Sequence, residues 1–159
     1  MKITSHISTC LKTSFILQLA TAVENIPWIC TVCFAADTDF VVYWFSRHNA
    51  RHSQEIVTNP HVAATVAVPY ALGDKAQGIQ IIGHAQEIKD EKRLLKGLTT
   101  LKKRYRVSAK RFQELQEELL GGKADYGLYC IIPEQIILHD TKHFPNAPRQ
   151  VYTPTPLKK

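Results

Sequence analysis

The segment "WICTVCFAADTDFVVYWFS" (residues 28–46) decides the fold class, because it holds the densest run of apolar residues in the chain. Its two halves, residues 28–37 and 40–46, are rich in β-branched and aromatic residues, which favour β-strands. The polar "DTD" between them predicts a turn, so we interpret the two halves as a β-hairpin. Nearly every residue of both halves is apolar. We therefore expect a barrel interior to cover one face of each strand and a helix or a second subunit to cover the other.

The flanking segments continue this pattern of strands separated by turns or helices. Ile3, Ile7 and Leu11 recur at helical spacing and favour a helix over residues 3–13. Residues 14–23 favour a strand that ends in the turn "ENIP". The elements predicted after residue 46 are a helix over 50–59 ended by Pro60, strands over 61–70 and 79–88 with a bulge or bend at Gly83, helices capped by Asp90 and Ser108, a "GG" stop at 121–122, a strand over 126–140 kinked near Pro133, and an extended tail over 144–159.

These elements predict a single mainly-β domain over residues 1–159. About six strands joined by short turns imply antiparallel pairing, and a small barrel with peripheral helices buries their apolar faces most simply. Residues 90–122 would form a helical insertion in that barrel. No internal repeat and no long linker divides the chain.

The composition is that of an ordinary globular protein, with 45% hydrophobic and 21% charged residues. No apolar stretch reaches the roughly 18–20 residues that span a bilayer, and "MKITSHISTCLKTSF" is a poor secretory signal. We therefore expect a cytoplasmic protein with no membrane association. The net charge of +6 permits nucleic acid, anionic membranes or phosphorylated small molecules as partners, and selects none of them.

The cysteines and histidines predict neither a disulfide scaffold nor a metal site. Cys30 and Cys33 form a C-x-x-C motif, but residues three apart on a strand point to opposite faces and lie roughly 10 Å apart. They could not form one disulfide or share one metal, so we interpret both as packing residues. The seven histidines form no H-E-x-x-H or H-x-H pattern.

Positive charge gathers in "SRHNARHSQEIVTNP" (residues 46–60), where a strand is followed by a helix. The free N–H groups at a helix N-terminus bind anions, and Arg51 and His52 would add donors there. Positive side chains disfavour this end of a helix, so a bound anion would offset that cost. The two interpretations left open are a phosphate site and a solvated basic loop.

A second basic segment covers residues 92–111 and contains nine Lys or Arg residues. It could form a nucleic-acid face, but no series of aromatic residues for base stacking accompanies it. We prefer a solvated helix face opposite a leucine stripe, so nucleic acid is not an expected partner.

Taken together, "LATAVENIPWICTVCFAADTDFVVYWFS", "ARHSQEIVTNPHVAATV" and "GIQIIGHAQEI" resemble the FMN-binding split barrels related to pyridoxamine 5′-phosphate oxidase. The resemblance runs from about residue 15 to residue 88, and "HDTKHFPNAPRQ" resembles the end of one uncharacterised subgroup. It implies a six-stranded antiparallel split β-barrel that forms a homodimer with flavin at the subunit interface.

The resemblance also implies which residues contact the cofactor. They are Cys30, Thr31, Val32 and Cys33 along the flavin ring, Phe45, Ser46, Arg51 and His52 around its phosphate, and Gln80 from the partner subunit. The chain departs from the oxidases at three of the family's positions, where Cys30 replaces Arg, Ala35 replaces Lys and His52 replaces Lys. The residues that hold the substrate phosphate in the oxidases lack convincing counterparts, so we do not expect oxidation of pyridoxamine phosphate itself.

The resulting expectation is an FMN-binding flavoprotein, an oxidoreductase whose substrate and electron donor, a nicotinamide or a small molecule, the sequence leaves open. No side chain stands out as a proton donor to the flavin, so no catalytic residue is predicted. The alternatives are the same fold with the deazaflavin F420 or haem, a stress-related flavin-binding module without turnover, and a nucleic-acid-associated protein that uses residues 92–111.

Overall fold

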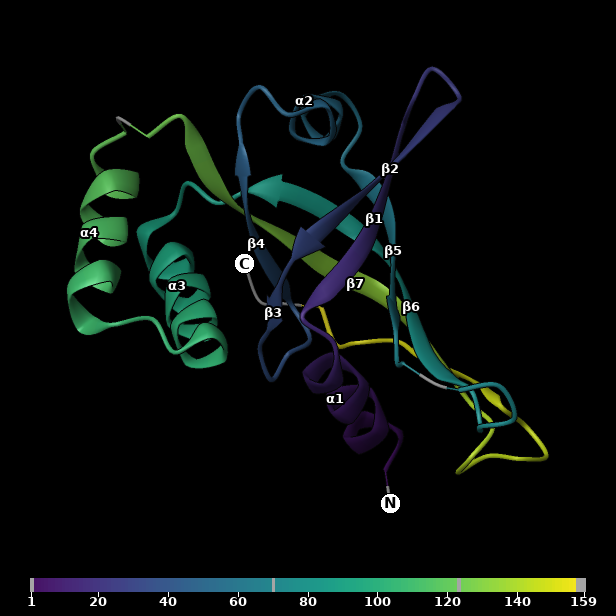
Figure 1. The fold of residues 1–159 in the computed structure, drawn as a ribbon. Coiled ribbons are helices and arrows are strands. Elements are labelled where there is room, and N and C mark those ends of the chain that lie inside the picture. The colour runs from purple at the N-terminus through teal and green to yellow at the C-terminus, as the bar shows by residue number, and fades with distance from the viewer. Residues whose placement is uncertain (1, 70, 123, 157–159) are drawn as a thin grey trace.

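The computed structural model describes residues 2–69, 71–122 and 124–156, and it shows a curled sheet with four helices packed around it (Figure 1). The elements in chain order are α1 (Ile3–Thr13), β1 (Ile16–Val23), β2 (Ile26–Cys33), β3 (Ala35–Ala36), β4 (Val42–Arg47), α2 (Arg51–Thr58), β5 (His61–Ala67), β6 (Gln77–Glu87), α3 (Glu91–Tyr105), α4 (Ala109–Leu120), β7 (Tyr126–Asp140) and β8 (Arg149–Tyr152). Among the described helices, none combines the length and apolarity that a membrane crossing requires.

The sheet has eight strands rather than the expected six, and all of its pairings are antiparallel. Seven of them follow the order β2-β1-β5-β6-β7-β4-β3, and β8 pairs with β7. Strands β2 and β3 are at opposite ends of this path, yet only Phe34 separates them in the chain. The sheet must therefore curl until its two edges meet. The backbone N–H of Phe34 donates to the carbonyl oxygen of Phe15 at 3.2 Å, which continues the β1–β2 pairing by one residue before the chain enters β3.

The hairpin expected between residues 28–37 and 40–46 is wrong for most of its length. Strand β2 pairs instead with β1, in a register that sets Val23 opposite Ile26. The two loop residues, Glu24 and Asn25, have φ angles of 51° and 63°. Positive φ at both central positions gives a tight loop whose twist matches the flanking strands. Only the two residues of β3 pair with β4.

Two hydrophobic cores form on either side of β4. Val42 and Trp44 face the barrel interior, which α1 and α2 help to close. Val41 and Tyr43 face the opposite way and pack against the leucines of α3. This confirms that residues 40–46 are covered on both faces, by a barrel interior and by a helix.

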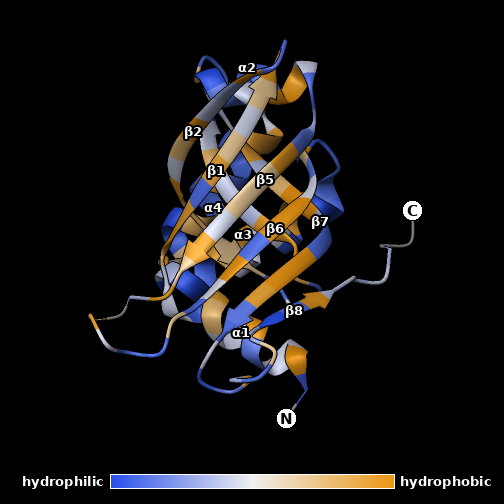
Figure 2. Cartoon of the chain, turned by 90° about the vertical axis from the view of Figure 1, so that its right-hand side faces the viewer, coloured by the Kyte–Doolittle hydropathy of each residue, from blue (hydrophilic) through white to orange (hydrophobic). Residues whose placement is uncertain are grey.

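The same expectation is not met for β2, whose outer face is exposed. On this face Ile29 is 60% exposed, and Ile26 and Trp28, which project from the other face at the start of β2, are 58% and 39% exposed. Figure 2 looks onto this side of the molecule, where β1, β5 and β6 lie in front and α3 and α4 lie behind the sheet. An apolar strand in this chain therefore has one face without a partner from the same chain.

The local signals elsewhere predicted the structure well. The side chains of Asp90 and Ser108 accept hydrogen bonds from the third residues of α3 and α4, at 2.8 and 3.2 Å. The register between β6 and β7 shifts at Gly83, which confirms the expected bulge. The tail expected to be extended over residues 144–159 is extended only from residue 148, because residues 144–147 form turns, and residues 157–159 lie outside the described residues. Residues 149–152 form the edge strand β8, which the sequence did not indicate.

Candidate functional site

The candidate site begins where β4 ends and α2 starts. Helix α2 follows Ala50, whose side chain cannot cap it, and its first turn contains no acidic residue. The first backbone N–H groups of a helix have no partners within the helix. The start of α2 therefore presents donors without a local side-chain acceptor, as an anion site requires.

Two arginines and one histidine of this segment each lie beside a carboxylate. The pairs are Arg47 with Asp125 at 3.9 Å, His48 with Glu87 at 2.9 Å, and Arg51 with Glu55 at 2.8 Å. These carboxylates offset part of the cost of placing positive charge at a helix N-terminus. The positive charge of this segment is thus partly balanced by carboxylates of the protein itself, and it does not by itself require an external anion.

Ser46 and His52, two of the predicted phosphate contacts, share a hydrogen bond. The Oγ atom of Ser46 lies 2.7 Å from Nε2 of His52 and accepts a hydrogen bond from Ser53 at 2.8 Å. Burial lowers the pKa of His52, and the nearby Glu55 carboxylate opposes this effect. His52 is therefore a neutral donor or acceptor at neutral pH rather than a fixed cation.

Arg51 is the cation best placed to reach a ligand. Its Nε atom binds Glu55, and its guanidinium lies over the ring of Trp28 at 4.3 Å. Glu55 also accepts a hydrogen bond from Thr21, and the bonds from Thr21 and Arg51 lower the pKa of its carboxyl. The Arg51 side chain is 48% exposed and borders a cavity of about 310 Å³ between α2 and the β1–β2 loop. Arg51 is thus oriented through Nε, and its terminal nitrogens remain as further donors.

The four residues predicted along the flavin ring divide between the two faces of β2. The side chain of Val32 is buried in the barrel core, and that of Cys30 is half-buried on the same side. Thr31 and Cys33 are exposed on the outer face. Cys30 and Cys33 are both free thiols. Cys30 packs against the barrel core, but Cys33 is exposed, so its interpretation as a packing residue is wrong.

Gln80 of β6 lies on the same outer face as Thr31 of β2, and strands β1 and β5 lie between them. The register aligns Thr31 with Gln18, Gln18 with Thr65, and Thr65 with Gln80. We call these four residues the polar row. Its Thr31 hydroxyl donates to Gln18 at 2.8 Å.

An apolar row runs beside the polar row, formed by Ile29, Ala20, Ala63 and Ile82. The two alanines leave a hollow of about 310 Å³ between the larger side chains. The apolar and polar rows together make the outer sheet face, on which Thr31 and Gln80 can reach one ligand from different strands.

Phe45 does not point toward the phosphate side. Its ring packs edge-on against Tyr126, at 5.9 Å between centroids, in the core under α3 and α4. Alternation along β4 explains this, because Ser46 faces the barrel end near His52 and its neighbour must face the other way. Only the backbone of Phe45 remains available to a cofactor at that end.

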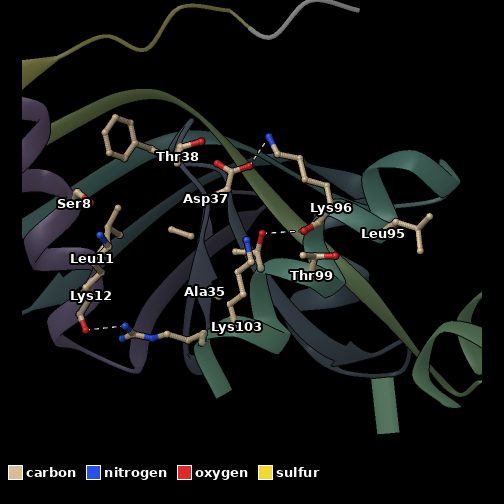
Figure 3. Close-up of a pocket in the computed structure, with 14 residues that line it drawn as sticks. Ser8, Leu11, Lys12, Ala35, Asp37, Thr38, Leu95, Lys96, Thr99 and Lys103 are labelled. Carbon is tan, nitrogen blue, oxygen red and sulfur yellow. Dashed lines mark hydrogen bonds and ion pairs between the residues drawn. The ribbon is translucent and has the colours of Figure 1, made fainter. Parts of the chain in front are cut away.

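The sequence did not indicate a cavity of about 630 Å³ between α1, the β3–β4 turn and α3 (Figure 3). Its polar residues include Lys12 from α1 and Lys96, Thr99 and Lys103 from α3. The spacing of the last three on one helix face was the available signal. Their position opposite α1 depends on the tertiary fold.

Two basic residues of this cavity are held by the protein itself. Lys96 pairs with Asp37 at 2.6 Å and Asp39 at 2.8 Å. Burial alone would lower the pKa of Lys96, but these bonds outweigh burial and raise it. Arg104 donates to the carbonyl oxygens of Lys12 and Ser14 at the end of α1. The basic segment 92–111 is therefore more than a solvated face, because it also anchors the β3–β4 turn and α1.

Comparison with known proteins gives a family and a fold. The sequence model described as pyridoxamine 5′-phosphate oxidase matches residues 3–140. No curated protein matches the chain. A structure from Listeria innocua assigned as a pyridoxamine 5′-phosphate oxidase has a TM-score of 0.63 at 19% identity, covering 86% of this chain and 98% of that chain.

Two further structures show the range of proteins that share this fold. A conserved hypothetical protein from Mycobacterium tuberculosis has a TM-score of 0.73 at 12% identity, covering 100% of this chain and 93% of that chain. A haem storage protein from Vibrio cholerae has a TM-score of 0.63 at 18% identity, covering 86% of this chain and 94% of that chain. At these identities the likeness shows the fold alone. Because the family model matches most of the length and the curled antiparallel sheet agrees with it, the chain belongs to the pyridoxamine 5′-phosphate oxidase family.

Proposed function

We propose that the protein is an FMN-binding flavoprotein whose phosphate site is the start of α2. The observation that carries this proposal is the placement of Arg51 in the first turn of a helix that has no side-chain cap, with Nε bound to Glu55. A guanidinium fork and free backbone N–H groups are the donors that a phosphate dianion accepts best. The donors present at this end of the barrel thus fit the phosphate of FMN.

Arg51 and the first-turn N–H groups would hold the phosphate, and His52 would add one neutral hydrogen bond. For His52 to do so, its Nε2 atom must bind the phosphate in addition to Ser46 or in place of it. The outer part of β2, with Thr31 and Cys33, would lie along the ring, as the family resemblance implies. When bound, FMN supplies the redox chemistry, and the protein positions it and excludes water. A small substrate or a nicotinamide would reduce the flavin.

The outer sheet face supports a homodimer in this proposal. Ile29 and Ile82 of the apolar row are 60% and 45% exposed on this face. Neighbouring apolar side chains of this kind on a sheet face mark a protein-binding surface. A second copy that covers this face would also enclose a ligand between Arg51 of one protomer and Gln80 of the other.

Titration of the purified, ligand-free protein with FMN tests the proposal directly. We expect saturable quenching of flavin fluorescence at one FMN per chain, because a buried ring loses contact with water. Haem is the alternative to be measured in parallel, given the likeness to a haem storage protein. Stoichiometric haem binding in the absence of any FMN binding would contradict the flavin proposal.

Ile29→Lys is expected to raise the dissociation constant of the proposed dimer by about 100-fold or more. A two-fold interface would bury the new charge in both copies, and an unpaired buried charge costs about 3–5 kcal/mol. Sedimentation velocity over a concentration series measures the effect.

Leu72→Lys is the matched control for this variant, because Leu72 is fully exposed and lies outside the outer sheet face. It should leave the dimer unchanged. A monomeric parent protein, or equal dissociation constants for Ile29→Lys and the parent, would contradict the proposed interface.

A further inference from the structure

A polar cluster with two buried members lies at the opposite end of the barrel from α2, where α1 packs against the end of β7 (Figure 1). Its members are His6 of α1, Asp140 at the last position of β7, and His143 in the turn that follows. The proposed flavin site uses none of them. The sequence pattern did not reveal this cluster, because His6 is far from the other two residues along the chain.

Asp140 is fully buried and is oriented by the backbone of its own turn. Its Oδ1 atom accepts the N–H groups of Lys142 at 3.0 Å and His143 at 2.9 Å. Burial alone would raise the pKa of Asp140, but hydrogen bonds from His143 and Gln77 outweigh it and lower the pKa. Two backbone N–H groups thus occupy Oδ1 of this buried carboxylate, and Oδ2 remains for other partners.

The second oxygen, Oδ2, is presented to two imidazoles at once. Nδ1 of His143 lies 2.8 Å away, and Nδ1 of His6 lies 3.6 Å away. The two rings are close to each other, with centroids 4.4 Å apart. The turn geometry explains the bonds to Oδ1. It does not explain why a second, almost completely buried histidine faces the same oxygen beyond hydrogen-bond distance.

The geometry points to a divalent transition-metal site formed by His6, Asp140 and His143. We propose that it binds Zn²⁺ or a similar late first-row ion through two imidazole nitrogens and one carboxylate oxygen. Ligand atoms about 2.1 Å from a tetrahedral Zn²⁺ lie about 3.4 Å apart, a value bracketed by the two distances to Oδ2. All three ligand atoms lie within 4.8 Å of one another, so the rings need only a small inward shift.

The surroundings suit such an ion. Backbone hydrogen bonds to Oδ1 orient the carboxylate as a supporting shell does in metal sites. The His143 side chain is 37% exposed, which gives an ion a path to the cluster and leaves room for water as a fourth ligand. The bound ion would join α1 to the end of β7 and to the tail, segments that are otherwise distant in the chain.

A second group, His61, His84 and Glu134, also brings three ligand atoms within 4.8 Å of one another. His84 lies 3.0 Å from Glu134, but both side chains are about half exposed. Glu134 is thus exposed to water, whereas Asp140 is buried and oriented by two backbone N–H groups. We assign the site to the polar cluster and use His84 as the matched control.

The experiment measures Zn²⁺ binding by the untagged, chelator-stripped full chain in competition with a chromogenic chelator. We expect one tightly bound Zn²⁺ per chain. His143→Ala should weaken binding by about 10-fold or more, because it removes a ligand from an exposed turn. His84→Ala should leave the affinity unchanged. Co²⁺ in place of Zn²⁺ should give the absorption of a low-symmetry, four-coordinate site in the parent and in His84→Ala, but not in His143→Ala.

Hydrogen exchange gives a second, independent readout. Zn²⁺ should slow amide exchange across residues 3–13 in the parent and in His84→Ala, but not in His143→Ala, because the ion holds α1 in place. The proposal is overturned if the parent takes up no stoichiometric Zn²⁺, if His143→Ala binds it as tightly as the parent, or if His84→Ala loses as much affinity as His143→Ala. FMN binding is not involved in either readout, so failure of this site and failure of the flavin proposal are distinguishable.

Discussion

Arg51→Ala is expected to weaken FMN binding by about 10- to 100-fold. A hydrogen bond to a charged group contributes about 1.5–3 kcal/mol, and Arg51 would supply the charged donors to the phosphate. The fold should tolerate the change, because the ion pair with Glu55 is partly exposed and such pairs add little stability. Fluorescence titration with FMN measures the affinity, and thermal unfolding without FMN checks the fold.

Three variants control this result. Arg47→Ala removes a neighbouring cation that is 73% exposed and pairs with Asp125, and it should leave FMN affinity nearly unchanged. Arg51→Lys keeps the charge but loses the fork, so an intermediate affinity is expected. His52→Lys should preserve or tighten binding. Equal flavin affinity in Arg51→Ala and the parent would refute the phosphate site.

Gly83→Ala is expected to lower the free energy of unfolding by about 3 kcal/mol, which corresponds to a fall in Tm of about 6–12 °C. A Cβ atom at this position would lie 2.3 Å from the carbonyl oxygen of Ile132 and 2.9 Å from Cα of Pro133. Both contacts are with backbone at the bulge between β6 and β7, which cannot move away as a flexible side chain could. Urea unfolding of the ligand-free protein measures the loss.

Gly78→Ala is the matched control, because it lies on the same strand. Its added Cβ would approach the carbonyl oxygen of Val66 at 3.2 Å, which calls for a shift of only tenths of an ångström. We expect a loss well below that of Gly83→Ala. If the two variants unfold at the same urea concentration, the close backbone approach at the bulge is not the reason why position 83 requires glycine.

Elements with local signals were predicted with nearly correct limits. The caps at Asp90 and Ser108, the end of α2 before Pro60 and the bulge at Gly83 all depend on residues within a few positions of one another. The pairing of strands was predicted less well. Residues 28–33 could pair with β4 or with β1 on composition alone, and the "EN" loop with its two positive φ angles favours β1.

The candidate site shows the same division. The sequence placed Arg51 and His52 at the start of a helix, because charge and position along the chain suffice for that. It could not show that His52 is bonded to Ser46, that Arg51 is oriented by Glu55, or that Phe45 packs under α3 and α4. Side-chain partners across a barrel depend on which strands meet, and one residue of register reverses the face that each side chain occupies.

The sequence by itself determined the family resemblance, the mainly-β class and the position of the basic turn before α2, since each depends on short-range patterns of apolar, charged and turn-forming residues. Only the tertiary structure decided that β2 and β3 end at opposite edges of one curled sheet, that an apolar outer face is left uncovered, and that His6 meets Asp140 and His143. Those outcomes follow from burying one shared core, which brings together residues more than a hundred positions apart without leaving a trace in the local sequence.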